Sequence, residues 1–121
     1  TLTGACVVAL GEDYSGLFTN SPDMAESLLA SAADTGEGLW RLPLPKAYRK
    51  KLNAEWADIK NLGDRWGGSI TAALFLSEFV DGPDWAHVDI AGPAFHDKKH
   101  HHFASGATGT MVSTLTRWVT R

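Results

Sequence analysis

The chain has 121 residues, of which 14 are acidic and 11 basic, so its formal net charge at neutral pH is −3. This length allows one modest domain, and 44% hydrophobic with 21% charged residues is typical of a globular protein rather than a disordered one. The acidic balance gives no reason to expect nucleic acid as a partner, and no apolar stretch approaches the length of a membrane span, so no membrane partner is expected.

The chain begins with a segment whose apolar composition is typical of the interior of a protein. Residues 5–10 are a continuous apolar run with two adjacent valines, which predicts a strand buried on both faces. The single cysteine, Cys6, lies in this run and behaves there as a small hydrophobe. A lone cysteine favours a reducing compartment, so we expect a cytoplasmic protein. Because no methionine precedes Thr1, we interpret the chain as a piece of a longer protein.

Strands and helices alternate along the rest of the chain, which predicts an α/β fold. The strongest signal is Ser21-Pro22, a hydroxyl cap followed by proline at the first helical position. Gly36 and Gly38 are expected to end the helix that begins there. The elements predicted after residue 10 are, in order, a strand near 17–19, the helix after Ser21, an extended segment over 42–45, a short helix over 46–52, irregular structure over 53–68, a buried helix over 70–80, a strand over 86–90, a long loop over 92–107 and an amphipathic helix over 111–119.

Histidines are the most conspicuous metal-binding candidates. His100, His101 and His102 are adjacent in the sequence, and His96 lies nearby. Adjacent histidines in a loop chelate weakly, whereas structural zinc sites use spaced ligands in a fixed geometry. We therefore favour a solvated loop and expect no metal ligand in this chain.

His87 and Asp89 are expected on one face of their strand, because residues i and i+2 point the same way. An imidazole beside a carboxylate suits a metal half-site, or a base with the acid that orients it. We favour instead a structural pair, with both groups satisfied by neighbouring backbone.

Four segments together resemble the leucine aminopeptidase (cytosol aminopeptidase) family: residues 1–5 (TLTGA), 67–76 (GGSITAALFL), 85–92 (WAHVDIAG) and 106–109 (GATG). They occur in the family's order and at about its spacing, and the match covers essentially the whole chain. The resemblance implies that residues 1–121 are the C-terminal segment of the catalytic domain, part of a three-layer αβα domain with a mixed central sheet of the zinc-exopeptidase type. The upstream metal-ligand segment and the N-terminal domain are then expected to lie outside the chain.

The resemblance also implies a mechanism for the parent protein. In the family, two divalent metal ions (manganese, zinc or magnesium) activate a water and polarise the scissile carbonyl, with a bound bicarbonate assisting. The segment Asn-Thr-Asp-Ala-Glu-Gly-Arg, which carries metal ligands in the family, has no copy here. The implied parent removes N-terminal residues, leucine among them, from peptides and assembles as a homo-hexamer. This chain alone is expected to bind neither metal ion and to be inactive.

What the resemblance carries over to this chain is the wall of the substrate site. Thr1, Leu2 and Gly4 match a strand end that holds the substrate's main chain and lines the first side-chain pocket. The Leu2 amide also matches a bicarbonate contact. Ala91 matches another residue of the first pocket, and Leu62 matches a wall residue of the next one. These residues are the substrate-binding candidates, and no catalytic residue is expected.

Two rival interpretations come from other functional classes. One is a non-catalytic binding or interaction module derived from the same fold. The other, a distant third, is a serine hydrolase, since Ser105, Ser113, His96 and Asp97 supply the ingredients of a triad. The Gly-x-Ser-x-Gly turn that would present such a serine is absent from the sequence.

Overall fold

A three-stranded mixed sheet lies at the centre of the computed structural model, which describes residues 3–121. The middle strand is β1 (Tyr14–Thr19), which pairs in parallel with β2 (Gly38–Arg41) and antiparallel with β3 (Ala86–Asp89). Residues 15–19 of β1 are all buried, as expected for a strand that is covered on both faces. The predicted α/β class with a mixed sheet is therefore confirmed.

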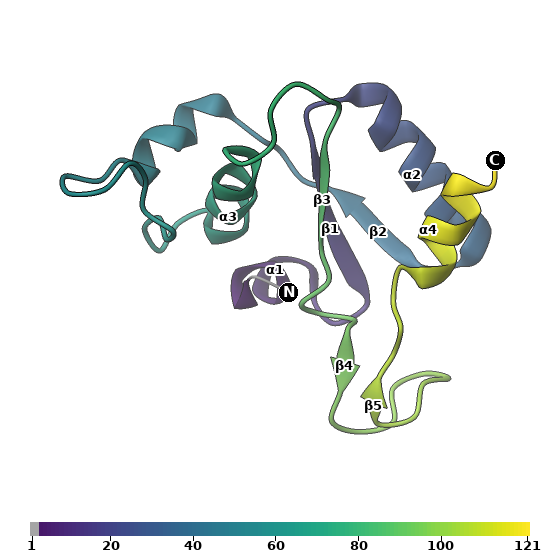
Figure 1. Ribbon diagram of the computed structural model, residues 1–121. Coiled ribbons are helices and arrows are strands. Elements are labelled where there is room, and N and C mark those ends of the chain that lie inside the picture. Colours follow the sequence, from purple (N-terminus) through teal and green to yellow (C-terminus); the bar gives the residue numbers. More distant parts are fainter. Residues whose placement is uncertain (1–2) are drawn as a thin grey trace.

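Helices cover both faces of this sheet, which gives the expected three-layer arrangement (Figure 1). On one face, α2 and α4 pack against each other, and on the other lie α1 and α3, with the 3-10 helix η1 beside α3. None of these helices in the described part of the chain is long and apolar enough to cross a membrane. The helical elements are α1 (Gly4–Leu10), α2 (Pro22–Thr35), η1 (Lys46–Leu52), α3 (Gly68–Ser77) and α4 (Val112–Val119).

Neighbouring residues of β1 show how the two layers attach. Leu17 packs into the apolar cluster formed with α2, whereas a Cβ added to Gly16 would lie 2.9 Å from Sγ of Cys6 in α1. Only a residue without a side chain allows α1 to approach the sheet this closely. Beyond the end of the sheet, the short strands β4 (Phe95–His96) and β5 (Gly106–Ala107) pair as a hairpin that extends away from the body of the domain (Figure 1).

The larger apolar core fills the space between the sheet and helices α2 and α4. Leu17 of β1 is fully buried and clusters with Leu28 and Ala32 of α2. Ala25 of α2, Leu39 of β2 and Met111, next to α4, complete the cluster. Full burial of an aliphatic side chain of this size contributes about 1.5–3 kcal/mol, so this layer supplies much of the stability of the fold.

The N-terminal apolar run is a helix, so the strand predicted over residues 5–10 is wrong. The hydroxyl of Thr3 accepts a hydrogen bond from the Cys6 amide at 3.2 Å and caps α1, and Gly11 ends it with φ +76°. Within α1 only Cys6 is buried, and Val8 is 90% exposed. A short apolar run has no periodicity that separates a strand from a helix, so the cap and the glycine decide between them.

Most of the remaining helices and the strands β1 and β3 agree with the prediction apart from their bounds. Strand β2 was not predicted, and β4 and β5 lie within the segment predicted as a long loop, over 92–107. Ser21 caps α2, and Gly36, with φ +74°, ends it, while Gly38 begins β2 instead of belonging to the helix end. The helix predicted over 70–80 begins two residues earlier and ends at Ser77. Phe79 lies beyond that end and is 68% exposed, so the burial predicted for this segment is wrong at its C-terminal end.

Candidate functional site

A pocket of about 520 Å³ opens where α1 begins, facing α3 and the loop that precedes α3. Its volume is in the range of sites that take small molecules or single side chains. Its apolar walls come from both helices and from the loop. The lining residues are Thr3, Gly4, Ala5, Asn61, Leu62, Gly63, Asp64, Arg65, Gly68, Thr71, Ala72 and Phe75.

Two of the predicted substrate-binding residues, Gly4 and Leu62, line this pocket together. A Cβ added to Gly4 meets no atom within 4 Å, so this position opens onto free space. Leu62 is 74% exposed and presents its apolar side chain at the opening. The fold therefore joins two candidates that the sequence keeps in separate segments.

The buried carboxylate of Asp89 links a third candidate, Ala91, to the same place. The Thr3 hydroxyl donates a hydrogen bond to Oδ2 of Asp89 at 2.8 Å, and the Ala91 amide donates to Oδ1 at 3.1 Å. Ala91 does not line the pocket itself but is held near Thr3 through this carboxylate. The other two candidates, Thr1 and Leu2, lie outside the described residues.

Sequence reasoning missed the role of Thr3. A threonine before a strand has no helix to cap, so the incorrect strand over residues 5–10 concealed the signal. With α1 recognised as a helix, Thr3 three residues before Cys6 is an ordinary capping position. The same hydroxyl bonds Asp89, which joins the start of α1 to the end of β3.

Burial controls the ionisation of the groups beside Asp89. Burial raises the pKa of the Cys6 thiol to about 11, and the nearby Asp89 carboxylate adds to this rise. Cys6 is therefore a protonated thiol at neutral pH and is not a nucleophile. Burial also lowers the pKa of His87, which the charge of Asp89 opposes.

The expected structural pair of His87 and Asp89, with both groups satisfied by neighbouring backbone, is confirmed only for Oδ1 of Asp89, which accepts from the Ala91 amide. Asp89 accepts hydrogen bonds on both oxygens. The His87 ring stacks on Phe18 and on Trp85, with centroids 5.9 and 6.4 Å away, and among the described residues its buried Nε2 has no hydrogen-bond partner. Aromatic packing therefore holds His87, rather than the backbone bonds that we expected.

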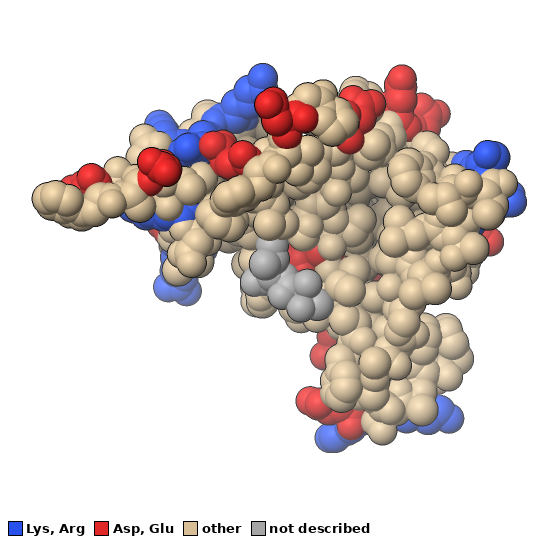
Figure 2. All heavy atoms as spheres, viewed as in Figure 1, with Lys and Arg blue, Asp and Glu red and all other residues tan. Residues whose placement is uncertain are grey.

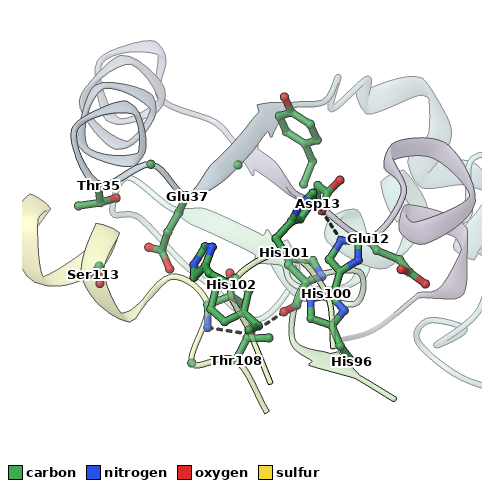
Figure 3. A pocket seen from close by; sticks show the side chains of 17 residues that line it. Glu12, Asp13, Thr35, Glu37, His96, His100, His101, His102, Thr108 and Ser113 are labelled. Atoms are coloured by element: carbon green, nitrogen blue, oxygen red, sulfur yellow. Dashed lines mark hydrogen bonds and ion pairs between the residues drawn. The ribbon is translucent and has the colours of Figure 1, made fainter. Parts of the chain in front are cut away.

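One group of side chains within residues 3–121 has the chemistry of a metal site (Figure 3). Nε2 of His100 lies 2.7 Å from Oδ1 of Asp13, and Nε2 of His101 lies 3.2 Å from the same oxygen. The hydrogen bond from His100 lowers the pKa of Asp13 below its usual value, and His101 contributes to this shift. The three residues line a second pocket, of about 550 Å³.

This group differs from the donor set that the resemblance implies for two catalytic metal ions, which is a lysine with aspartates and a glutamate. Its nitrogen ligands are two histidines of one loop, and its pocket shares no lining residue with that of Gly4 and Leu62. The described residues therefore do not fit the implied metal pair. We assign no step of a two-metal reaction to them.

Charged side chains are scattered on the face seen in Figure 2, with acidic and basic groups interspersed near its margins. The centre of that face is largely uncharged. A protein that binds the nucleic-acid backbone presents a continuous basic stripe, and this face has none.

Comparison with known proteins gives a consistent result. A model of the cytosol aminopeptidase family, catalytic domain, matches residues 1–116. The probable cytosol aminopeptidase of Synechococcus elongatus is 56% identical over 119 residues, which cover 98% of this chain and 24% of that protein. The probable cytosol aminopeptidase of Prochlorococcus marinus (strain MIT 9313) is 56% identical over 120 residues, with the same coverage of 98% and 24%.

A solved structure of a mutant tomato leucine aminopeptidase has the same fold as this chain. The TM-score is 0.90 at 44% sequence identity, and the match covers 97% of this chain and 22% of that one. The chain thus spans about a quarter of the length of the relatives that it matches.

Proposed function

The chain belongs to the cytosol aminopeptidase family, and we propose that it is the C-terminal segment of the catalytic domain of an aminopeptidase. The proposed reaction is hydrolysis of N-terminal residues, leucine among them, from peptides. Because the chain spans 24% of its relative's length, we place the metal ligands and the catalytic groups in other segments of a longer protein. We propose a cytoplasmic homo-hexamer as its setting, as the resemblance implies.

The observation that carries this proposal is the convergence of family motifs on one pocket. Residues 1–5 contribute Gly4 to its wall, and residues 67–76 contribute Phe75. The third motif, residues 85–92, reaches the same place through Asp89, which bonds Thr3. Segments that are far apart in the sequence therefore build one small site, as substrate recognition requires.

We propose that this pocket receives the side chain of the substrate's N-terminal residue. Ala5, Ala72 and Phe75 provide apolar surface, and burial of a leucine-like side chain against such surface contributes roughly 25 cal/mol per Å². Leu62 lines the same pocket, although the resemblance matches it to the wall of the next one. Gly4 leaves room for that side chain, because nothing stands where its Cβ would be.

The rest of the chain's proposed contribution is positioning. Asp89 holds Thr3 and Ala91 in place, so that the wall keeps its shape when a substrate binds. Two divalent ions (manganese, zinc or magnesium), held by residues outside this chain, would activate the attacking water when bound. We place a bicarbonate ion at the Leu2 amide, as the resemblance implies.

The test is a chimera of the Synechococcus elongatus relative in which this chain replaces the matching segment. With manganese or zinc added, the chimera is expected to hydrolyse a chromogenic leucyl amide and to lose that activity with a chelator. The 121-residue chain alone is expected to give no turnover under the same conditions. Chelator-sensitive turnover by the isolated chain would refute the placement of the metal ligands outside it.

A variant of the chimera tests the pocket itself. Gly4→Leu places a side chain in the open space and is expected to lower kcat/KM for a leucyl amide by about tenfold or more. The loss for an alanyl amide should be smaller, because a methyl group needs less of the pocket. Val8→Leu, on the exposed part of α1, is the matched control and should leave both rates unchanged. Equal losses for the two substrates would mean that Gly4 does not line a side-chain pocket.

Exposed apolar side chains favour a second candidate, a non-catalytic interaction module of the same fold. Trp56 is 93% exposed, Trp66 70% and Phe79 68%. Large apolar groups left in water commonly mark a surface that another segment or protein covers. A folded chimera without activity would favour this candidate over the aminopeptidase.

A further inference from the structure

We propose that Asp13, His100 and His101 form a binding site for one divalent transition-metal ion, zinc foremost, which fastens the hairpin loop to the body of the domain. Two imidazole nitrogens and one carboxylate oxygen are the donors. In Figure 3 these side chains point toward one another at one end of the pocket. The proposal goes beyond the proposed peptidase function and does not depend on it.

A tight turn brings the two adjacent histidines together. In an extended strand their side chains would point to opposite sides. Here the His100 amide donates to the Phe103 carbonyl at 3.1 Å, and the Phe103 amide donates back at 2.9 Å, which closes a turn around His101. His101 has φ +50°, a conformation that residues other than glycine rarely adopt, and strain of this kind is concentrated at functional sites.

The carboxylate comes from a different part of the chain that is itself held firmly. Asp13 lies 87 positions before His100, in the turn between the end of α1 at Gly11 and the start of β1 at Tyr14. Gly92 follows β3 against this turn, and a Cβ there would collide with the Gly11 carbonyl. The fold therefore presses the segment that leads into the hairpin against the loop that carries Asp13.

Another histidine of the hairpin packs against one of the proposed ligands, His100. His96 on β4 is 5% exposed, and its ring centroid lies 4.5 Å from that of His100. At the base of the hairpin, the Thr108 amide donates to the Ala94 carbonyl at 3.0 Å. Packing of this kind restricts the orientation of the ligand ring, as groups around a metal ligand do in established sites.

The donor set and its dimensions select the class of ion. Imidazole nitrogens with a carboxylate suit zinc, nickel, copper and cobalt, whereas calcium and magnesium prefer oxygen ligands. Bonds of 2.0–2.2 Å in a tetrahedral site place ligand atoms about 3.3 Å apart. The ligand atoms here all lie within 4.8 Å of one another, with two separations of 2.7 and 3.2 Å, so side-chain adjustments suffice. The exposed side chains of Asp13 and His101 leave room for water to complete the coordination.

Binding of the ion would join two segments that otherwise meet through exposed contacts. The hairpin extends from the domain (Figure 1), and the ion would hold its tip region to the turn before β1. A ligand that binds the folded state more tightly than the unfolded state raises the temperature of unfolding. Zinc is therefore expected to stabilise the chain through this clamp.

The test is titration of the 121-residue chain with zinc chloride, followed by calorimetry and by thermal unfolding. The wild-type chain is expected to bind one equivalent and to unfold at a higher temperature with zinc than without it. Asp13→Asn and His100→Ala should each weaken binding about tenfold or more and remove the thermal shift. His102→Ala is the matched control, because His102 lies in the same turn but outside the ligand group, and it should bind zinc within twofold of the wild type.

His101→Gly separates loss of a ligand from loss of the fold. Glycine accepts the positive φ of this position without strain, so the metal-free variant should be at least as stable as the wild type while its zinc affinity falls about tenfold or more. Circular dichroism of each metal-free variant reports its folding. Zinc binding that is unchanged in Asp13→Asn, equal loss in His102→Ala, or no stoichiometric binding by the wild type would each overturn the proposal.

Discussion

The central sheet has a buried apolar cluster on one side and, on the other, a pocket with an exposed apolar side chain at Leu62. On the side of α2 and α4, an apolar cluster around Leu17 is buried, and Glu37 accepts hydrogen bonds from the amides of Met111 and Thr114 at 2.6 and 2.8 Å. On the side of α1 and α3, Val8 is 90% exposed and Leu62 is 74% exposed. Leu17 therefore holds the fold, whereas Leu62 is available for binding at the pocket and Val8 has neither role.

The largest expected effect tests this difference directly. Leu17→Ala removes a fully buried side chain from the core under α2 and should lower the free energy of unfolding by about 2–5 kcal/mol. Val8→Ala, on the opposite side, should change it by less than about 0.5 kcal/mol because Val8 is already in water. Urea unfolding followed by circular dichroism measures both. Similar losses of unfolding free energy in the two variants would show that the buried Leu17 side chain contributes no more to stability than the exposed Val8 side chain.

A smaller effect is expected at the polar cap of α4. Met111, at the N-cap of α4, provides no side-chain cap and has φ +68°, so the Glu37 carboxylate accepts the bonds that a capping side chain would otherwise accept. Glu37→Gln replaces one acceptor oxygen by a donor and should cost about 1–3 kcal/mol in urea unfolding. Glu55→Gln, at an exposed loop position, is the control for loss of charge alone. If both variants unfold at the same urea concentration, Glu37 does not hold α4 to β2.

The smallest effect concerns His87, on the side of α1 and α3. Burial lowers its pKa in the folded chain, while the unfolded chain keeps a value near 6.5. As the pH falls below about 6.5, the unfolded chain takes up a proton that the folded chain does not, so stability decreases toward acid until the folded pKa is passed. His87→Phe removes this proton uptake and should reduce the loss of stability between about pH 7 and pH 5.5.

The control for that comparison is His102→Phe, at an exposed position, which should keep the wild-type dependence on pH. Urea midpoints at several pH values measure the slopes. A His87→Phe slope equal to that of the wild type would show that the protonation of His87 contributes nothing to acid destabilisation.

Local signals account for the elements that were predicted correctly. Ser21 with its following proline marks the start of α2, and Gly36 marks its end, because a cap and a left-handed residue act within one helical turn. The apolar stripe over residues 111–119 likewise predicts α4. The run over residues 5–10 lacks a period, so its helix was not recognised, and with it the capping role of Thr3 was missed.

The candidate site was predictable only as separate pieces. The resemblance placed Gly4, Leu62 and Ala91 among the substrate-binding candidates, and the fold brings Gly4 and Leu62 to one pocket. The connection through Asp89 to Thr3 spans 86 positions, and no local pattern encodes such a bond.

The sequence by itself determined the α/β class, the family and most of the helices, because these depend on capping residues, glycines and motifs that act over a few positions. Tertiary structure alone decided which distant groups meet. The histidines at 100 and 101 indicated only a solvated loop until the fold placed Asp13 against them. A contact between distant segments depends on how the whole chain packs, and the spacing of residues along the sequence does not predict that packing.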